Sequence, residues 1–313
     1  MRRRLPLAAA ILTLLGPGLA AAGDAGREIP LRLRSRAEDP NRPGTFVVAE
    51  KAEAWDPSRT AVIVCDMWDA HHCLNAVRRG DEMAPTMDRV LKALRDRGVV
   101  VVHAPSSCMA AYDDHPARKH ARQTPRSKSL PVEIGKWCYK IPAEERGAYP
   151  IDQTDGGEDD DPAEHKEWAA KLAAMGRNPK LPWKSQTDKL TILPGDYISD
   201  DGEEIWSILE DRRVDNVILL GVHLNMCVLG RPFGLRQMAK NGKHVVLMRD
   251  LTDTMYNPER SPKVSHFAGT ALMVEHVEKF VCPTIASDQV LGGVPFRFRG
   301  DSDVPTAGST AAK

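Results

Sequence analysis

The chain has 313 residues, of which 42% are hydrophobic and 27% are charged, so it is long and apolar enough to bury a full globular core. Its 43 basic residues balance 43 acidic ones. Because no net field would attract a nucleic acid or an anionic membrane, the composition argues against both partners and favours small-molecule ligands.

The N-terminus has the pattern of an export signal. Arg2, Arg3 and Arg4 precede an apolar stretch at 5–19, and small residues at 20–22 suit cleavage. The apolar stretch is too short to span a bilayer comfortably. We therefore expect a signal peptide at 1–22, an exported (periplasmic or secreted) protein and no stable membrane insertion once the signal is removed; a retained membrane anchor is the competing interpretation.

The six cysteines are scattered and form no Cys-x-x-Cys pair. This spacing predicts neither a disulfide framework nor a usual structural zinc site. They are Cys65, Cys73, Cys108, Cys138, Cys227 and Cys282.

The first part of the mature chain leads into a buried strand. Residues 23–58 are rich in Arg, Pro, Gly and Asp, which indicates a linker and an edge ribbon. The apolar run at 61–65 predicts a strand, and Asp66 follows it directly. Since parallel sheets place ligands just outside the carboxyl ends of their strands, Asp66 is a candidate catalytic residue.

A helix and a second strand follow. Apolar residues at helical spacing predict a helix over 85–97, and Gly98 suits its C-terminal cap. The second strand is predicted at 99–102, with His103 at its carboxyl end. A histidine in this place is more often a hydrogen-bonded neighbour than a base.

Residues 108–187 have no clear strand pattern, so they are either a lid over the site or a peripheral insertion. Their acidic run at 155–161 is expected to stay in solvent, with a loose calcium site as the alternative. A short helix is predicted over 164–175.

The remaining elements alternate between strand and helix, and a flexible tail is expected at 293–313. We predict strands at 189–193, 217–220 and 243–249, and helices at 202–212, 229–238 and 265–281. The order predicts an α/β fold of three layers, with a central parallel sheet flanked by helices.

Cys227 lies at the turn between the strand at 217–220 and the following helix. Unpaired amides and the positive dipole at a helix start would stabilise a thiolate, so a lowered pKa and a nucleophilic role are expected there. The alternative is a small buried apolar residue.

Three motifs in the same order resemble the isochorismatase-like cysteine hydrolases. The family's first strand and aspartate are similar to Val-Cys-Asp66-Met-Trp-Asp. Its nucleophile elbow, the turn that carries the catalytic cysteine, is similar to Gly221-Val-His-Leu-Asn-Met-Cys227-Val. Val246-Leu-Met-Arg-Asp250 is similar to the strand that follows. The resemblance covers about 59–292, which we take as one domain.

The resemblance implies an aspartate–lysine–cysteine triad that hydrolyses amides or a vinyl ether. Asp66 would take the thiol proton of Cys227, and a cis peptide bond is implied near Val222-His223. Trp68, His223 and Asn225 flank the two catalytic candidates and are expected to contact substrate, although packing and turn hydrogen bonds would explain them equally well.

The family's lysine is missing. Its slot falls near Leu193-Pro194, neither of which can carry charge, while Lys184 and Lys189 lie elsewhere. Arg118 or Lys119 could supply a cation from the insertion, or His103 could partly replace it. Without a cation, a carboxylate and a thiolate in one pocket would disfavour double ionisation.

No metal or cofactor is predicted. The Asp-x-His motif of the nicotinamidase metal site is absent after the second strand. His71 and His72, beside Asp69, would point to opposite faces of an extended segment, so too few ligands converge.

Two functions remain open. The first is an exported cysteine hydrolase that cleaves a small amide or a similar C–N bond. The second is a non-catalytic binding or scaffold protein that has lost the lysine. Family members commonly self-associate, so a homo-oligomer is expected.

Overall fold

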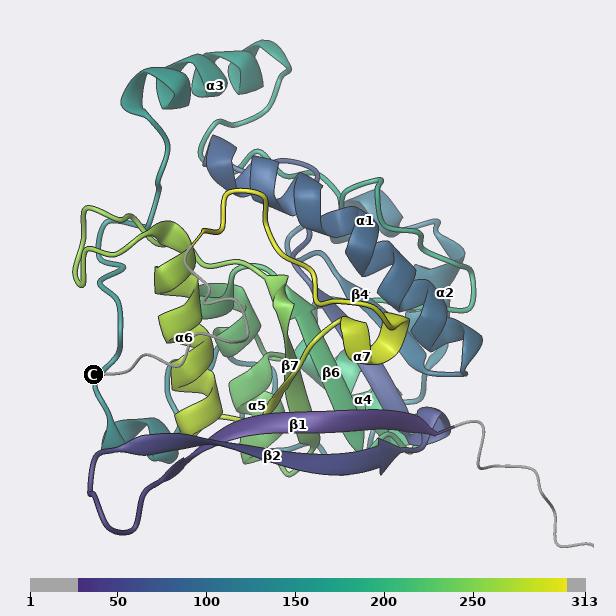
Figure 1. The fold of residues 1–313 in the computed structure, drawn as a ribbon. Coiled ribbons are helices and arrows are strands. Elements are labelled where there is room, and N and C mark those ends of the chain that lie inside the picture. Colours follow the sequence, from purple (N-terminus) through teal and green to yellow (C-terminus); the bar gives the residue numbers. More distant parts are fainter. Residues whose placement is uncertain (1–27, 303–313) are drawn as a thin grey trace, which may run out of the picture.

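A computed structural model describes residues 28–302, which form one eight-stranded sheet with helices on both faces (Figure 1). The strand order is β2-β1-β8-β7-β6-β3-β4-β5. The strands are β1 Ile29–Glu38, β2 Phe46–Trp55, β3 Thr60–Cys65, β4 Val100–Ala104, β5 Tyr197–Ile198, β6 Asn216–Gly221, β7 His244–Thr252 and β8 Thr284–Ile285. The run β8-β7-β6-β3-β4-β5 is parallel throughout, whereas β1 pairs antiparallel with both β2 and β8. The predicted α/β class is confirmed.

The two faces of β3 belong to two different cores. Ala61, Ile63 and Cys65 pack with the helices at Gly202–Asp211, Leu235–Lys240 and His266–Phe280. Val62 and Val64 pack with the helices at Leu74–Asp96 and Asp288–Leu291. This alternation is what a strand covered on both sides requires. The helices are α1 Leu74–Asp96, α2 Pro116–Gln123, α3 Pro162–Ala174, α4 Gly202–Asp211, α5 Leu235–Lys240, α6 His266–Phe280 and α7 Asp288–Leu291.

Three predicted elements need correction. The strand at 189–193 is wrong, since the third parallel strand is the two-residue β5. The helix predicted from Pro85 begins at Leu74, so Pro85 lies inside α1 rather than at its start. The helix expected at 229–238 is interrupted at 231–234, where Pro232 has no amide hydrogen to donate, and α5 resumes at Leu235.

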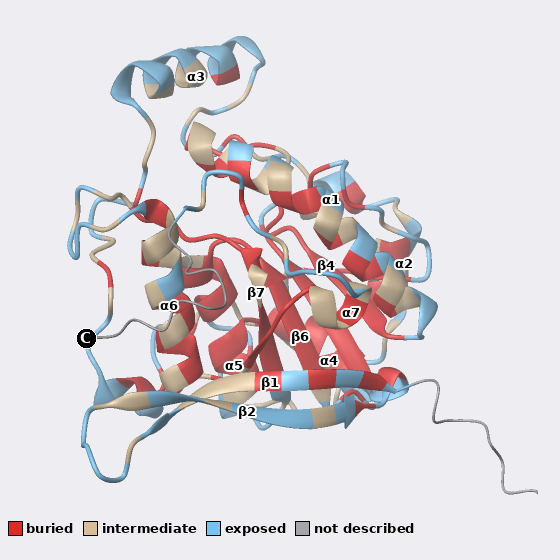
Figure 2. Cartoon of the chain, in the orientation of Figure 1, coloured by how far each residue is buried: buried red, intermediate tan, exposed pale blue. Residues whose placement is uncertain are grey.

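The segments at the two ends of the domain pack on it. Residues 29–55 form the antiparallel β1–β2 hairpin, and β2 is the outermost strand, with pale blue exposed stretches in Figure 2. At the other end, Phe296 and Phe298 pack against the α1-side core, so residues 293–302 are not the free tail that we expected. The predicted signal at 1–22 and residues 303–313 lie outside the described part.

The insertion at 108–187 contains α2 and α3, and α3 stands out from the body of the molecule (Figure 1). Its remaining stretches run back over the carboxyl ends of the strands, as described below. Within residues 28–302, no helix is both long enough and apolar enough to cross a membrane.

Candidate active site

The site is built where β3 and β6 end side by side. Asp66 follows β3 in a left-handed conformation, with φ of 47°, and its amide donates to the carbonyl of Ala104. A β-carbon on Gly221 would lie 2.0 Å from the carbonyl oxygen of Cys65, so only glycine lets the two strand ends approach this closely. The cis peptide bond implied by the resemblance is present between Val222 and His223.

Cys227 lies on a one-turn π-helix, Leu224–Val228, that follows β6. It is 9% exposed and packs with the α4–α6 core, beside the half-buried Trp68 and Trp137. Its thiol is a hydrogen-bonding neighbour of both the Asp66 carboxyl and the Arg231 guanidinium. The two catalytic candidates, 161 positions apart in sequence, therefore meet.

The cation that sequence analysis missed is Arg231. Its Nε donates to Oδ2 of Asp66 at 3.0 Å, and Asp66 itself is 0% exposed. Ser106 adds a backbone amide on Oδ1 at 2.7 Å. Arg231 stands four positions after Cys227, and its amide donates to the Cys227 carbonyl, which brings both side chains to Asp66. The spacing of one helical turn between Cys227 and Arg231 is the sequence signal that could have identified this cation.

The cations suggested by the sequence are engaged elsewhere. Arg118 pairs with Glu204, and Lys119 pairs with Asp114 at 3.2 Å. His103 is a buried neighbour of Gln186 and Asp196, as expected for a hydrogen-bonded histidine. Lys189 pairs with Asp81. The segment after β5 is Ser199-Asp200-Asp201, which also lacks a cation.

The protonation states at the site follow from burial. Desolvation raises the pKa of Asp66, which the positive charge of Arg231 partly opposes. Desolvation, followed by the charge of Asp66, raises the pKa of Cys227 well above its usual range. The expectation of a lowered Cys227 pKa is thus wrong, because loss of water outweighs the helix dipole. One positive and one negative charge leave the pocket neutral, with the sulfur as a thiol.

Two tryptophans of the insertion close over these residues, so this stretch is a lid rather than a peripheral insertion. The Trp137 ring lies over the Arg231 guanidinium at 5.5 Å, and the amide of Cys138 donates to the carbonyl of Gly230 at 2.8 Å. Gly230 makes this contact possible, since a β-carbon there would lie 2.3 Å from the Trp137 indole.

The second lid tryptophan packs on a predicted contact residue. Trp183 stacks on Trp68 with ring centroids 4.4 Å apart. The Trp68 indole donates to the carbonyl of Ser106, the residue whose amide holds Asp66. Trp68 therefore lies beside the catalytic candidates and under the lid.

The other two predicted contact residues lie on different sides of the elbow. His223 is 3% exposed and faces the rings of the β3–α1 loop, with His71 4.9 Å away between centroids. Asn225 is fully engaged, because its amide bonds both the amide and the carbonyl of Met255 and also Gln153. Asn225 is therefore placed to hold the elbow.

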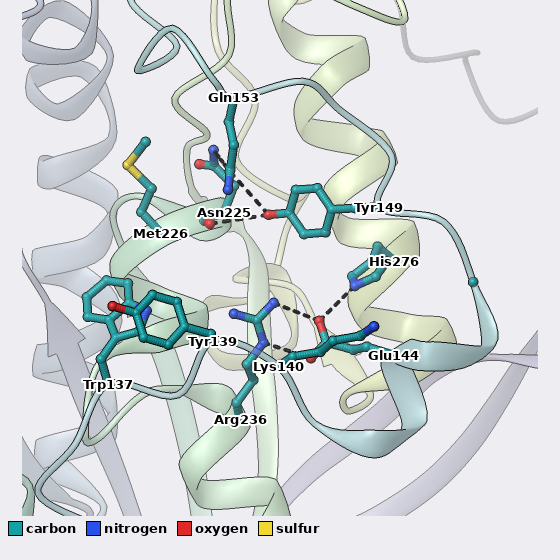
Figure 3. Close-up of a pocket in the computed structure, with 11 residues that line it drawn as sticks. Trp137, Tyr139, Lys140, Glu144, Tyr149, Gln153, Asn225, Met226, Arg236 and His276 are labelled. Carbon is teal, nitrogen blue, oxygen red and sulfur yellow. Dashed lines mark hydrogen bonds and ion pairs between the residues drawn. The ribbon is translucent and has the colours of Figure 1, made fainter.

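Asn225 also lines a cavity of about 590 Å³ between the elbow, α5, α6 and the lid (Figure 3). Inside it, Glu144 accepts bonds from both Arg236 and His276, and Tyr149 donates to the carbonyl of Asn225. These bonds hold the pKa of Glu144 down at about 2, against the effect of burial. The network fixes the lid to α5 and α6.

The histidines near Asp66 do not form a metal site. His71 and His72 lie side by side with centroids 4.0 Å apart, contrary to the prediction of opposite faces, because the chain bends there. Within residues 28–302, one group has ligand atoms close enough for a metal, and it consists of Cys73, Asp159 and Asp160.

That group is already saturated by protein donors. Asp159 pairs with Arg79 and His266, while Asp160 accepts the amides of Leu74 and Asn75 at the start of α1. Part of the acidic run is thus half-buried and structural, which corrects the expectation that it stays in solvent. The carboxylate oxygens that a calcium ion would need are engaged in these contacts, which argues against the calcium site considered as the alternative.

No protein-family model matches the sequence, and no curated protein matches it. Solved structures that are similar include a cysteine hydrolase from Pseudomonas syringae pv. phaseolicola 1448A, with 16% identity over 76% of this chain and 92% of that one, at a TM-score of 0.44. An isochorismatase family protein from Burkholderia thailandensis shares 14% identity over 75% and 94%, at 0.41.

N-carbamoylsarcosine amidase from Thermoplasma acidophilum is also similar, with 14% identity over 62% of this chain and 83% of that one, at a TM-score of 0.34. Likenesses at this level identify no activity. The chain is an α/β protein with a sheet of mostly parallel strands, and its chemistry has to be argued from its own site.

Proposed function

We propose that the protein is a cysteine hydrolase that cleaves a small amide or a similar C–N bond. The observation that carries the proposal is the buried carboxyl of Asp66, held between the Arg231 guanidinium and the Cys227 thiol. A nucleophile, a proton acceptor and a fixed cation in one desolvated pocket are the parts that acyl transfer needs.

In the first half of the reaction, the Cys227 sulfur attacks the carbonyl carbon while its proton passes to Asp66. The step changes no net charge in the pocket, because the negative charge passes from the Asp66 carboxylate to the oxygen of the tetrahedral intermediate while Arg231 stays positive. Protonated Asp66 gives the proton to the leaving nitrogen as the C–N bond breaks, which leaves a thioester and a free amine. An amide needs this donor because the nitrogen would otherwise have to leave as an amide anion, which is a very poor leaving group.

In the second half, water attacks the thioester and Asp66 takes its proton. The sulfur leaves and recovers a proton from Asp66, so the acid product and the free thiol are restored. Arg231 is charged throughout, since an arginine does not lose its proton in this pH range. The cycle therefore needs no other titrating side chain.

A non-catalytic binding protein was the alternative because the family's lysine is missing. Arg231 supplies a positive charge at the carboxylate, which removes the reason for that alternative. A non-catalytic binding protein would bind small amides without turning them over.

A panel of small primary amides and carbamoyl compounds tests the proposal, with release of ammonia as the readout. We expect turnover of at least one member, lost in Cys227→Ala and Asp66→Asn and strongly reduced in Arg231→Ala. Turnover that survives Cys227→Ala would overturn the mechanism. Binding without turnover across the panel would favour the scaffold function.

We also propose that the protein is exported and self-associates. Export is supported by the sequence pattern at 1–22. Self-association is supported by β2, a ten-residue edge strand with Val47 and Val48 exposed. Because β2 carries Lys51 and Glu53 on either side of Ala52, an antiparallel second copy centred on Ala52 would place Lys51 opposite Glu53.

A further inference from the structure

A second, narrow cavity of about 30 Å³ lies between α1, the β3–α1 loop and the elbow. Its lining includes Gly80 and Asp81 of α1, of which Asp81 is exposed. It also includes Asp66, which is 0% exposed. The cavity therefore connects a surface helix with the proposed base.

Two buried imidazoles line this cavity, His71 and His223. His223 is 3% exposed, so its ring faces the protein interior and this cavity rather than bulk solvent. Burial lowers the pKa of His223 to about 4, so its ring is neutral and offers one donor and one acceptor. A water molecule in the cavity can therefore bond to this ring either as donor or as acceptor.

The volume decides which molecules fit. A cavity needs roughly 10–15 Å³ of this kind of space to hold one water, whereas ligand pockets typically measure about 300–1,000 Å³. A volume of about 30 Å³ therefore admits water or ammonia and excludes an organic substrate.

We propose that this cavity is the site from which the hydrolytic water reaches the thioester on Cys227, with His223 as its positioning residue. The inference rests on the proposed hydrolase function. His223 holds the water by a hydrogen bond, the water oxygen attacks the thioester carbonyl, and its proton goes to Asp66. The C–S bond then breaks, and Asp66 returns the proton to the sulfur.

Gly80 offers a way to close the cavity without disturbing the catalytic residues. A β-carbon at Gly80 meets no atom within 4 Å, and the residue has ordinary helical geometry, so Gly80→Leu can extend its side chain into the space. The matched control is Arg89→Leu, which adds the same side chain at an exposed position of α1.

The test uses p-nitrophenyl acetate as the acyl donor and the full chain. For Gly80→Leu we expect an unchanged burst of p-nitrophenolate, an acetyl group that accumulates on Cys227 by mass spectrometry, and steady-state turnover slowed by about 100-fold, a typical size for loss of base-assisted water attack. Arg89→Leu should behave as the wild type. Wild-type turnover in Gly80→Leu would overturn the inference.

A wild type that gives no burst would instead show that the proposed function fails. In that case a crystal structure of the wild type tests, independently of activity, whether the cavity holds water. Ordered solvent density within hydrogen-bonding reach of His223 would support a water site, and a dry cavity would overturn it.

Discussion

Asp66, Cys227 and Arg231 share one buried pocket in which one negative charge balances one positive charge. Removal of the guanidinium would leave a carboxylate with no ionic partner at 0% exposure. We expect Arg231→Ala to lower the free energy of unfolding by about 3 kcal/mol, as for other broken buried pairs. Urea denaturation measures this.

Two matched variants show whether the loss comes from charge. Arg231→Lys keeps the positive charge and should retain most of the stability, although it loses the planar geometry of the guanidinium. Asp66→Asn/Arg231→Ala removes both charges and should recover part of the loss. Equal stability of wild type and Arg231→Ala would show that the pair is not closed in solution.

The raised pKa of Cys227 predicts its reactivity. At pH 7 the sulfur is a thiol, so iodoacetamide should label it more slowly than a free cysteine, and labelling should accelerate as the pH rises. The charge of Asp66 is one cause of that raised pKa. Asp66→Asn should therefore speed labelling at pH 7, by about tenfold for each pKa unit removed.

The same Asp66→Asn variant should have lost its hydrolase activity, because the proton acceptor is gone. Faster labelling with lost turnover is a combination that a merely structural aspartate would not produce. Labelling that is fast at pH 7 in the wild type and slower in Asp66→Asn would contradict the assigned protonation states.

Sequence reasoning placed Asp66 and Cys227 because each depends on local pattern at a strand end, and the cis bond was implied by the resemblance to the isochorismatase-like hydrolases. Arg231 was missed because the family's slot, rather than the next turn after Cys227, guided the prediction. Trp137 and Trp183 were missed for another reason. Their positions depend on the path of a long insertion, which no local periodicity reports.

Among the elements, the lid is held to the elbow by a contact that tolerates no side chain at Gly230. We expect Gly230→Ala to displace Trp137, lower stability by about 1–3 kcal/mol as overpacking does, and expose Cys227 to faster alkylation. Thermal unfolding and labelling by iodoacetamide measure the two effects.

Gly195→Ala is the matched control, since its β-carbon would meet no atom within 4 Å. It should change neither stability nor labelling. If Gly230→Ala is as stable as the control and its Cys227 is no more reactive, the lid does not pack on the elbow in solution.

A second network joins α1, the acidic segment, the region after β7 and the start of α6. His266 lies between Asp253 and Asp159, and these carboxylates raise its pKa from 6.5 to about 9 despite burial. A raised pKa stabilises the fold fully below the unfolded value of 6.5, and the contribution disappears as the pH rises through 9. Its size is roughly 3 kcal/mol.

Urea denaturation from pH 6 to pH 10 tests this, with His266→Gln for comparison. The wild type should be more stable than His266→Gln at pH 6, and the difference should shrink as the pH passes 9. A difference that stays constant over this range would show that His266 is not charged in the folded protein.

The elements themselves were predictable where they are long. β3, β6 and β7 are apolar runs bounded by turns, and α6 has clear helical spacing, so their existence followed from the sequence. β5 was missed because two residues carry no periodicity. The early start of α1 was missed because Pro85, an apparent first residue, lies inside the helix.

For the whole molecule, the exposed edge of β2 predicts a dimer of extended sheets. Val48→Lys/Ala52→Lys adds positive charge beside Lys51 on the edge strand and should repel a second copy. Sedimentation of wild type and variant measures the oligomeric state. A wild-type monomer at micromolar concentration, or a dimer that survives the change, would show that β2 is not the interface.

The central claim is that Cys227 forms an acyl intermediate with Asp66 as its proton acceptor and Arg231 as the fixed cation. Rapid mixing with p-nitrophenyl acetate, followed by peptide mass spectrometry, tests it without knowledge of the natural substrate. The predicted result is one acetyl group per chain on Cys227, absent in Cys227→Ala and released by water at least about 100-fold more slowly in Asp66→Asn, which lacks the proton acceptor. Acetylation spread evenly over several cysteines, or release as fast in Asp66→Asn as in the wild type, would contradict it.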